Sequence, residues 1–387
     1  MTKLGDITYR VSTWNPTRAP GADKFDYIDL SAVDNESKSI VAPSRIAPFD
    51  APSRARQVVS AGDVLVSTVR PNLNAVATVP PALHGATAST GFTVLRPTTR
   101  LDGQYLFHWV RSQKFVADMV SKASGASYPA VSDRIVKDSS IPLPHIDEQR
   151  RIAAILDQAD ASRAKRRQAL AHLDDLTQSI FLDMFGDPVE NPLGLPTRAL
   201  SEWVTPDSPI TYGILKPGDD LPDGVPYIRV VDIRDGAILT ARVRRTSGEI
   251  AAAYERSKVA AGDLVISIRG HVGRIGMVPS ELQDANITQD SARIRLPSEV
   301  RDYVRAALET DSMAHWMARR TKGAAVRGLN LGDLRLAPVP VPPESEVREF
   351  SKSADHVRTQ RRLAVMQGEC AQQMFASLQS RAFSGQL

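Results

Sequence analysis

Cysteine is nearly absent from this sequence, because Cys370 is the one cysteine among 387 residues. A single thiol excludes a disulfide within the chain and is typical of a reducing compartment. Long apolar runs are missing too, which argues against a membrane-spanning helix. The first residues, MTKLGDITYRVSTW, lack the apolar core of a secretory signal. We therefore expect a cytoplasmic protein without membrane attachment.

The patterns that mark catalytic centres are also missing. The run RGHVGRIG at 269–276 lacks the Lys-Ser/Thr pair of a phosphate-binding loop, and no GxGxxG fingerprint is present. One cysteine and seven scattered histidines give no metal-ligand spacing. The stretch ESK at 36–38 has no upstream acid to complete a nuclease centre, and neither a Ser-His-Asp context nor the Asn-Pro-Pro-aromatic run of amino-methyltransferases occurs. These absences favour binding over catalysis, with no metal or cofactor held by this chain.

What remains is the composition of an ordinary folded protein. Hydrophobic residues make up 42% and charged residues 24%, and the length suffices for two or three domains with their own cores. The net charge of +4 and the pI near 9.2 are compatible with a polyanionic partner. They are weak indicators alone, since many unrelated proteins are as basic.

The chain repeats itself at a nearly constant offset of 198 to 200 residues, which is too long for a solenoid. In each half, short strands and turns precede a short helix, a glycine loop, a proline-rich exit and a long helix. We interpret this order as two domains of one fold, each followed by its own helix. The matching landmarks are Tyr27-Ile28 and Tyr227-Ile228, Ala61-Gly62-Asp63 and Ala261-Gly262-Asp263, 86–97 and 285–297, 121–144 and 321–343, and Pro144 and Pro342.

The expected strands are brief and rich in β-branched residues, as in DVLVST at 63–68 and DLVISI at 263–268. One short helix is predicted over 103–123, with Leu106, Val110, Phe115 and Met119 on one face, and its counterpart over 301–320. The predicted fold class is therefore α/β (α+β), with two repeated domains whose twisted sheets are mostly antiparallel.

A long helix is predicted over 147–185, because the segment has no glycine or proline and its apolar residues alternate at spacings of three and four. The second copy keeps this register. Each helix alone would expose its seam, so we expect the two to pair as an antiparallel coiled coil, with the domains at opposite ends. The residues predicted to pair are Ile152, Leu156, Ala159, Leu173, Ile180, Phe350, Val357, Ala371 and Leu378.

A basic run, Arg163, Lys165, Arg166 and Arg167, lies in the middle of the first long helix, and Arg358, Arg361 and Arg362 occupy the second. Two interpretations stay open. The run is a solvated helix face, or it contacts the DNA backbone or acidic groups of a partner.

Several of these pieces carry a family resemblance that covers nearly the whole chain. IPLPHIDEQRRIAAIL at 141–156, DLVISIRGHVGRIG at 263–276, NITQD at 286–290 and FLDMFGDP at 181–188 resemble the specificity (S) subunit of Type I restriction-modification systems. The resemblance implies a non-catalytic prokaryotic subunit whose two target recognition domains each read one half of a bipartite duplex DNA site. It also implies two partner methyltransferase (M) subunits, which would bind S-adenosylmethionine and methylate adenine N6, and added restriction (R) subunits that cut unmodified DNA.

Two departures from the family pattern matter. The first copy reads VRPNLNAVATV where the second keeps IRGHVGRIG, and Gln149 at the first helix entrance becomes Val347 at the second. Because of the change from Gln149 to Val347, equal docking of partners at the two helices is in doubt. We predict target recognition domains at 1–145 and 198–343, long spacer helices at 146–186 and 344–387, and a linker at 187–197.

The residues expected to touch DNA lie at three repeated places, since base readout needs Arg, Lys, Asn or Gln at exposed positions. Turn formation is an equally plausible role for the hairpin tips, local backbone bonding for the strand entrances, and helix capping for the glycine loops. Two further classes stay open, a self-contained DNA-modifying enzyme and a coiled-coil scaffold that binds proteins. The candidate residues are Arg70, Asn72, Asn74, Arg269, His271 and Arg274 in the tips, Ser89, Asn286 and Gln289 at the strand entrances, and Ser127, Tyr128, Arg327 and Asn330 in the loops.

Overall fold

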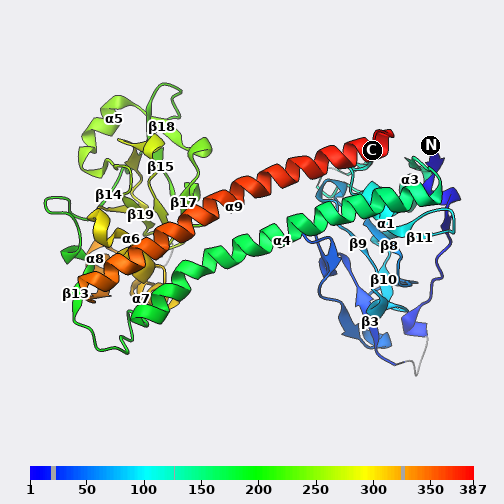
Figure 1. Ribbon diagram of the computed structural model, residues 1–387, viewed down its shortest axis with the longest axis horizontal. Helices are drawn as coiled ribbons and strands as arrows, with labels where there is room; N and C mark the ends of the chain where they lie inside the picture. The colour runs from blue at the N-terminus through cyan, green and yellow to red at the C-terminus, as the bar shows by residue number, and fades with distance from the viewer. Residues whose placement is uncertain (19–22, 126, 324–326) are drawn as a thin grey trace. The chain divides into compact units, whose positions relative to one another are not determined.

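The computed structural model describes residues 1–18, 23–125, 127–323 and 327–387. The chain divides into two compact units: unit 1 contains residues 1–168 and 365–387, and unit 2 contains residues 169–364. The long helices α4 (Ile146–Phe185) and α9 (Glu344–Ser384), green and orange-red in Figure 1, each contribute residues to both units.

Unit 1 contains small, mostly antiparallel sheets. One runs in the order β2-β11-β8-β9 and another in the order β6-β3-β10-β7, where β10 is parallel to β3. The pairs β1-β12 and β4-β5 complete the unit. The strands are β1 (Thr2–Lys3), β2 (Thr8–Tyr9), β3 (Phe25–Ile28), β4 (Val33–Asp34), β5 (Ser39–Ile40), β6 (Ser44–Ile46), β7 (Ala55–Val58), β8 (Val64–Ser67), β9 (Val76–Thr78), β10 (Thr87–Ser89), β11 (Phe92–Pro97) and β12 (Ser140–Ile141).

Unit 2 repeats this plan with two changes. Among its described residues, the sheet that corresponds to β6-β3-β10-β7 has three strands instead of four, without a counterpart of β7, and the larger sheet is extended. Its sheets run in the orders β14-β22-β19-β20-β17-β16 and β18-β15-β21, beside the pair β13-β23, so the counterpart of β4-β5 joins the larger sheet through a parallel contact between β17 and β20. The strands are β13 (Thr197–Ala199), β14 (Thr211–Tyr212), β15 (Val225–Ile228), β16 (Ile233–Arg234), β17 (Ala237–Ile238), β18 (Arg244–Thr246), β19 (Leu264–Ser267), β20 (Ile275–Met277), β21 (Asn286–Ile287), β22 (Ser291–Ile294) and β23 (Pro338–Pro340).

The central strand of each unit is buried on both faces. In β8, Val64 and Val66 belong to one apolar cluster and Leu65 to another, and β19 divides its residues between two clusters in the same way. Successive side chains of a strand point to opposite faces, and a strand covered on both faces reads as a continuous apolar run. This burial explains why the sequence after each AGD motif is apolar throughout.

The helix expected over 103–123 is in fact two helices, α1 (Gly103–Val110) and α2 (Gln113–Ser121). The Ser112 hydroxyl accepts a hydrogen bond from the Phe115 amide, 3.2 Å away, and so starts a new helix. Thr310 divides 301–320 likewise. The second pair is α6 (Ser298–Leu308) and α7 (Asp311–Arg320), and the remaining helices are α3 (Asp133–Asp138), α5 (Gly248–Ala253) and α8 (Leu331–Arg335).

The two long helices pair antiparallel within each unit, as predicted. In unit 1, Arg151 of α4 donates to the Leu387 carbonyl, and Arg166 donates to Gln367 of α9. Higher residue numbers in α4 therefore pair with lower residue numbers in the C-terminal segment, as antiparallel helices require. In unit 2, Phe181 packs edge-on against Phe350, with ring centroids 5.7 Å apart. Among the described residues, the structure has no helix long and apolar enough to cross a membrane.

The predicted pairing residues divide between the two units. Ile152, Leu156, Ala159, Phe350, Val357 and Ala371 are buried, whereas Leu173, Ile180 and Leu378 are half-buried. Leu378 packs against the core of unit 1, and Ile180 packs against that of unit 2. The core of each unit therefore contains residues from both long helices.

Gln149 fixes the entrance of α4 to unit 1. Its side chain is fully buried and accepts a hydrogen bond from the Asp102 amide, 2.9 Å away. It also donates to the carbonyls of Arg100 and Pro144, at 3.0 and 2.9 Å. Val347 stands at the corresponding position of unit 2 and cannot form these bonds.

Substitution of Gln149 by valine is expected to lower the free energy of unfolding by about 2–3 kcal/mol, because buried donors and acceptors lose their partner. Urea denaturation measures this loss. Gln158→Val is the matched control, since Gln158 is an exposed residue of the same helix and shares the lower helix propensity of valine. Equal effects of the two substitutions would contradict the role assigned to Gln149.

Candidate nucleic-acid interface

The hairpin tip of unit 1 lies between β8 and β9 and contains a short 3-10 helix, Pro71–Leu73. Arg70 and Asn74 flank this helix, and both have a φ of 48°, in the left-handed region that non-glycine residues rarely adopt. Arg70 and Asn72 are exposed, whereas Asn74 is half-buried. The tip thus presents a guanidinium and an amide to solvent on a backbone of uncommon shape.

The glycine loop of unit 1 lies against this tip. Val69 forms a β-bridge with Ala130, and the Arg70 amide donates to the Pro129 carbonyl at 2.7 Å. The Arg70 guanidinium lies over the ring of Tyr128, 4.7 Å from its centroid. Tyr128 is 69% exposed, and the adjacent Ser127 is exposed as well. Two separate candidate segments therefore form one polar and aromatic surface.

Unit 2 brings the same segments together with other side chains. Arg269 bridges to Gly328, and the Gly270 amide donates to the Arg327 carbonyl at 3.4 Å. The Arg269 guanidinium donates to the Gln289 side chain at 3.1 Å. His271, Arg274 and Arg327 are exposed. The surface here is more basic than its counterpart and has no residue equivalent to Tyr128 among those described.

Three other candidates have structural roles. Ser89 and Asn286 are 3% and 0% exposed, and Asn286 donates to the Tyr254 carbonyl and the Ser257 hydroxyl, at 3.1 Å each. Asn330 caps α8 by accepting from the Asp333 amide at 2.8 Å. Ser89 and Asn286 have little surface exposed in the free chain, and the cap occupies the Asn330 side-chain oxygen. DNA contact at Ser89 and Asn286 stays a prediction, which their burial in the free chain disfavours.

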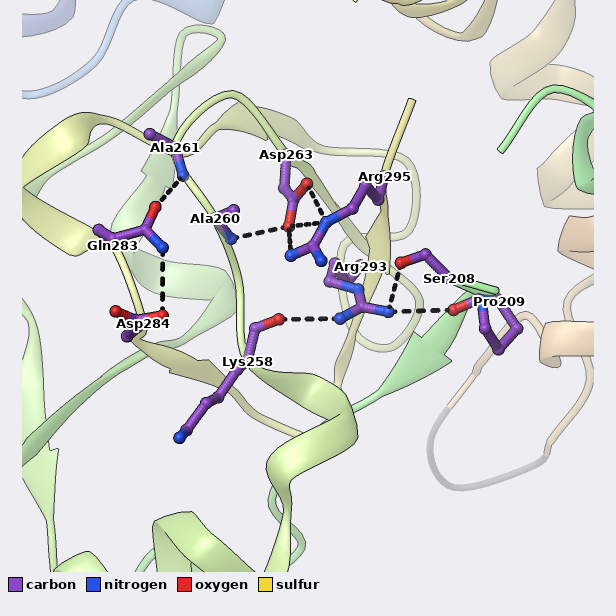
Figure 2. A network of polar contacts seen from close by, with 10 residues as sticks. All are labelled: Ser208, Pro209, Lys258, Ala260, Ala261, Asp263, Gln283, Asp284, Arg293 and Arg295. Carbon is purple, nitrogen blue, oxygen red and sulfur yellow. Dashed lines mark hydrogen bonds and ion pairs between the residues drawn. The ribbon is translucent and has the colours of Figure 1, made fainter. Parts of the chain in front are cut away.

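In each unit, a buried aspartate links the turn before the central strand to a neighbouring segment; we call this repeated arrangement of turn and strands the frame. In unit 2, Asp263 accepts hydrogen bonds from the Ala260 amide and from the Arg295 guanidinium, whose closest distance is 2.7 Å (Figure 2). In unit 1, Asp63 accepts in the same way from Ser60 and Arg96. These hydrogen bonds to Asp63 and Asp263 raise the pKa of Arg96 and Arg295. The repeated AGD motif therefore positions the turn and the neighbouring strand, not a ligand.

Sequence inspection passed over Arg96 and Arg295. Their signal was present, because each arginine follows its aspartate by 33 or 32 residues. Arg96 lies in β11, and Arg295 directly follows β22, the strands that pair with β8 and β19. A second arginine, Arg293, donates to the Lys258 carbonyl at 2.9 Å and to Ser208 at 3.0 Å in the same region (Figure 2). These guanidiniums hold segments together and are not free for DNA.

The basic run of the long helices is largely used for packing. Arg163 pairs with Asp160 at 2.7 Å, lies over the Phe375 ring at 4.3 Å and donates to Gln372. Burial lowers the pKa of Arg163. Arg361 donates to Asp174 in unit 2. The interpretation as a purely solvated helix face therefore does not apply to Arg163 and Arg361, which both contact the other long helix. Lys165 and Arg362 are exposed.

Comparison with known proteins places these features in a family. Residues 59–172 match the Type I restriction modification DNA specificity domain. The chain is 30% identical over 270 residues to the Type I restriction enzyme EcoBI specificity subunit of Escherichia coli, an alignment that covers 63% of this chain and 56% of that protein. It is 24% identical over 159 residues to the HindI specificity subunit of Haemophilus influenzae, across 40% and 34% of the two chains. The chain thus spans about a half and a third of the lengths of these curated relatives.

Solved structures give matches over the full length. A chain from work on the structural basis underlying complex assembly and conformational transition of the type I R-M system is 26% identical, with a TM-score of 0.65 and coverage of 100% and 97%. The S subunit of a Type-I restriction-modification system from M. genitalium shares the fold, with 14% identity, a TM-score of 0.54 and coverage of 98% and 95%. Residues 59–172 thus match a Type I restriction modification DNA specificity domain, and the chain as a whole is similar to specificity subunits of Type I restriction-modification systems.

Proposed function

We propose that this chain is the DNA-recognition subunit of a Type I restriction-modification complex and binds a bipartite, gapped duplex site. One recognition domain, residues 1–145 or 198–343, reads each half-site. The single observation that carries this proposal is the contrast between the two tips, since one buried frame occurs twice with different exposed side chains. Guanidinium and amide groups are the side chains that read base edges in the major groove.

The chain itself is proposed to be non-catalytic. In this proposal the helices at 146–186 and 344–387 set the spacing of the domains and dock two methyltransferase subunits, which bind S-adenosylmethionine and methylate adenine N6. Restriction subunits join the complex when they are present. The linker at 187–197 connects the halves, and the complex works in the cytoplasm of a prokaryote.

The test separates recognition from catalysis. The purified chain is incubated with S-adenosylmethionine and mixed duplex DNA, alone and together with the proposed methyltransferase partner subunit. We expect methylation only with the partner and only at one gapped motif. Methylation by the chain alone would establish a stand-alone enzyme, and assembly without any sequence-specific DNA binding would favour a protein scaffold.

Arg70→Ala is expected to weaken binding of the complex to its site by about 1–3 kcal/mol if Arg70 contacts a base, and to relax specificity in one half-site only. Affinity measurements with duplexes altered in either half-site test this. Arg134→Ala is the control, because Arg134 is an exposed residue of α3 with a 90% exposed side chain. An equal loss of affinity for every duplex would instead indicate a phosphate contact.

A further inference from the structure

One lysine connects the tip of unit 1 to a turn that is distant in sequence but adjacent in space. Lys38 lies in the turn between β4 and β5, with a φ of 56°. Its ammonium donates a hydrogen bond to the carbonyl oxygen of Asn74, the residue that ends the tip. Lys38 is half-buried. The bond crosses 36 residues of sequence and joins the tip to a neighbouring element.

The hydroxyl of Ser67, the last residue of β8, does not bond across the tip of unit 1. Ser67 uses its hydroxyl on its near neighbour Val69, donating to the carbonyl at 2.9 Å and accepting from the amide at 3.2 Å. Arg70 and Asn74 meanwhile adopt left-handed backbone conformations that cost free energy for non-glycine residues. Such a conformation persists only where surrounding contacts fix it, and the Lys38 bond is one of these contacts.

The tip of unit 2 is held differently. The Ser267 hydroxyl donates to the His271 carbonyl and accepts from the Arg274 amide at 2.9 Å, so one side chain spans the tip. Gly270 and Gly273 supply its positive φ values, 71° and 93°. The position that corresponds to Lys38 is Gly236, which has no side chain. The two units therefore stabilise the same hairpin by different chemistry.

The surroundings of Lys38 determine its charge. Its pKa is lowered to about 8: burial is the largest cause, Arg111 acts in the same direction, and Asp34 and Asp160 oppose the shift. The side chain is therefore mostly protonated at neutral pH and mostly neutral at pH 9. An ionised donor forms a hydrogen bond roughly twice as strong as a neutral one, so the hold on Asn74 weakens across this range.

We propose that Lys38 is a positioning residue, whose ammonium fixes the recognition tip of unit 1 through the Asn74 carbonyl and makes recognition of one half-site sensitive to alkaline pH. The inference rests on the proposed function. The second half-site has no such sensitivity, because the Ser267 hydroxyl does not titrate in this range.

The test uses the complex of the full chain with its methyltransferase subunits. Affinities are measured at pH 7 and pH 9 for the cognate duplex and for duplexes altered in either half-site. Lys38→Met is expected to weaken binding at pH 7 by about tenfold, the loss expected for one charge-assisted hydrogen bond. The loss should disappear when the half-site read by unit 1 is altered. Wild type should approach the variant at pH 9, and Lys38→Arg should remove the pH dependence.

Two controls separate the role from general effects. Lys3→Met removes the same charge at an exposed position, paired with Asp138, and should bind like wild type. Stability provides a second measurement, since a lysine with a lowered pKa in the folded state makes unfolding harder as pH rises from about 8 towards 10.5. Urea denaturation should show wild type gaining stability over the range where it loses affinity, and Lys38→Met should remove that gain.

Unchanged half-site discrimination by Lys38→Met at pH 7, or an equal loss in Lys3→Met, would overturn the inference alone. If Lys38→Met fails to fold, the comparison of wild type with Lys38→Arg at pH 9 decides, because equal affinities there would also overturn it. A wild-type complex that binds no duplex in a sequence-specific manner would overturn the proposed function, and this inference with it.

Discussion

Phe383→Ala is expected to destabilise unit 1 by about 3–5 kcal/mol, the usual loss when a buried aromatic side chain becomes alanine. Phe383 lies near the end of α9, more than two hundred residues after the last strand of unit 1, yet it is 7% exposed. Its ring contacts Tyr105 and Trp109 at centroid distances of 5.2 and 5.0 Å. The core of unit 1 is thus completed by the C-terminal end of the chain.

Hydrogen exchange measures where the loss occurs. We expect faster exchange in residues 1–168 and little change in unit 2. Phe185→Ala is the mirror experiment, because Phe185 packs on Tyr303 at 4.9 Å and should affect unit 2 instead. Met374→Ala is the control on α9, since Met374 is 52% exposed and should change stability by less than about 0.5 kcal/mol. Full protection of unit 1 in Phe383→Ala would contradict this description of its core.

Arg96→Ala is expected to cost about 3–5 kcal/mol, because it leaves the carboxylate of Asp63 buried without its counterion. The Asp63 side chain is 1% exposed and that of Arg96 is 25% exposed. The guanidinium also donates to the Val58 carbonyl at 3.2 Å, so the substitution removes a contact between two sheets. Chemical denaturation gives the magnitude, with Arg100→Ala as an exposed arginine control.

A double variant identifies the cause. Asp63→Asn with Arg96→Met removes the buried charge and keeps much of the apolar volume, and the asparagine oxygen can still accept from the Ser60 amide. We expect this variant to be more stable than Arg96→Ala, since removing both charges is less costly than stranding one. A double variant as unstable as the single one would assign the loss to packing instead.

Much of the fold could be predicted from sequence because its signals are local or periodic. The AGD turns, the apolar strands after them and the seams of α4 and α9 occur twice in one register, so each copy supports the interpretation of the other. The break at Ser112 was missed, although a serine ahead of a new helical turn is a capping signal. Apolar periodicity continues across that break and conceals it.

The candidate interface could be predicted only in part. The tips and glycine loops lie together, as β-bridges from Val69 and Arg269 require, but their sequence separation of about 60 residues gives no local signal. Ser89 and Asn286 resemble exposed polar residues in sequence, whereas tertiary packing buries them. Lys38 was overlooked for a similar reason, because its partner Asn74 is defined by the fold and not by a motif.

The assignment of one recognition domain to each half-site is the central feature of the proposed function. The decisive measurement is the map of methylated adenines in cells with the gene, without it, and with residues 1–145 exchanged for those of a homologue. Deletion should erase one bipartite, gapped motif and leave other methylation intact, and the exchange should alter a single half of that motif. A change in both halves after the exchange, or an unchanged methylation map after deletion, would contradict the account.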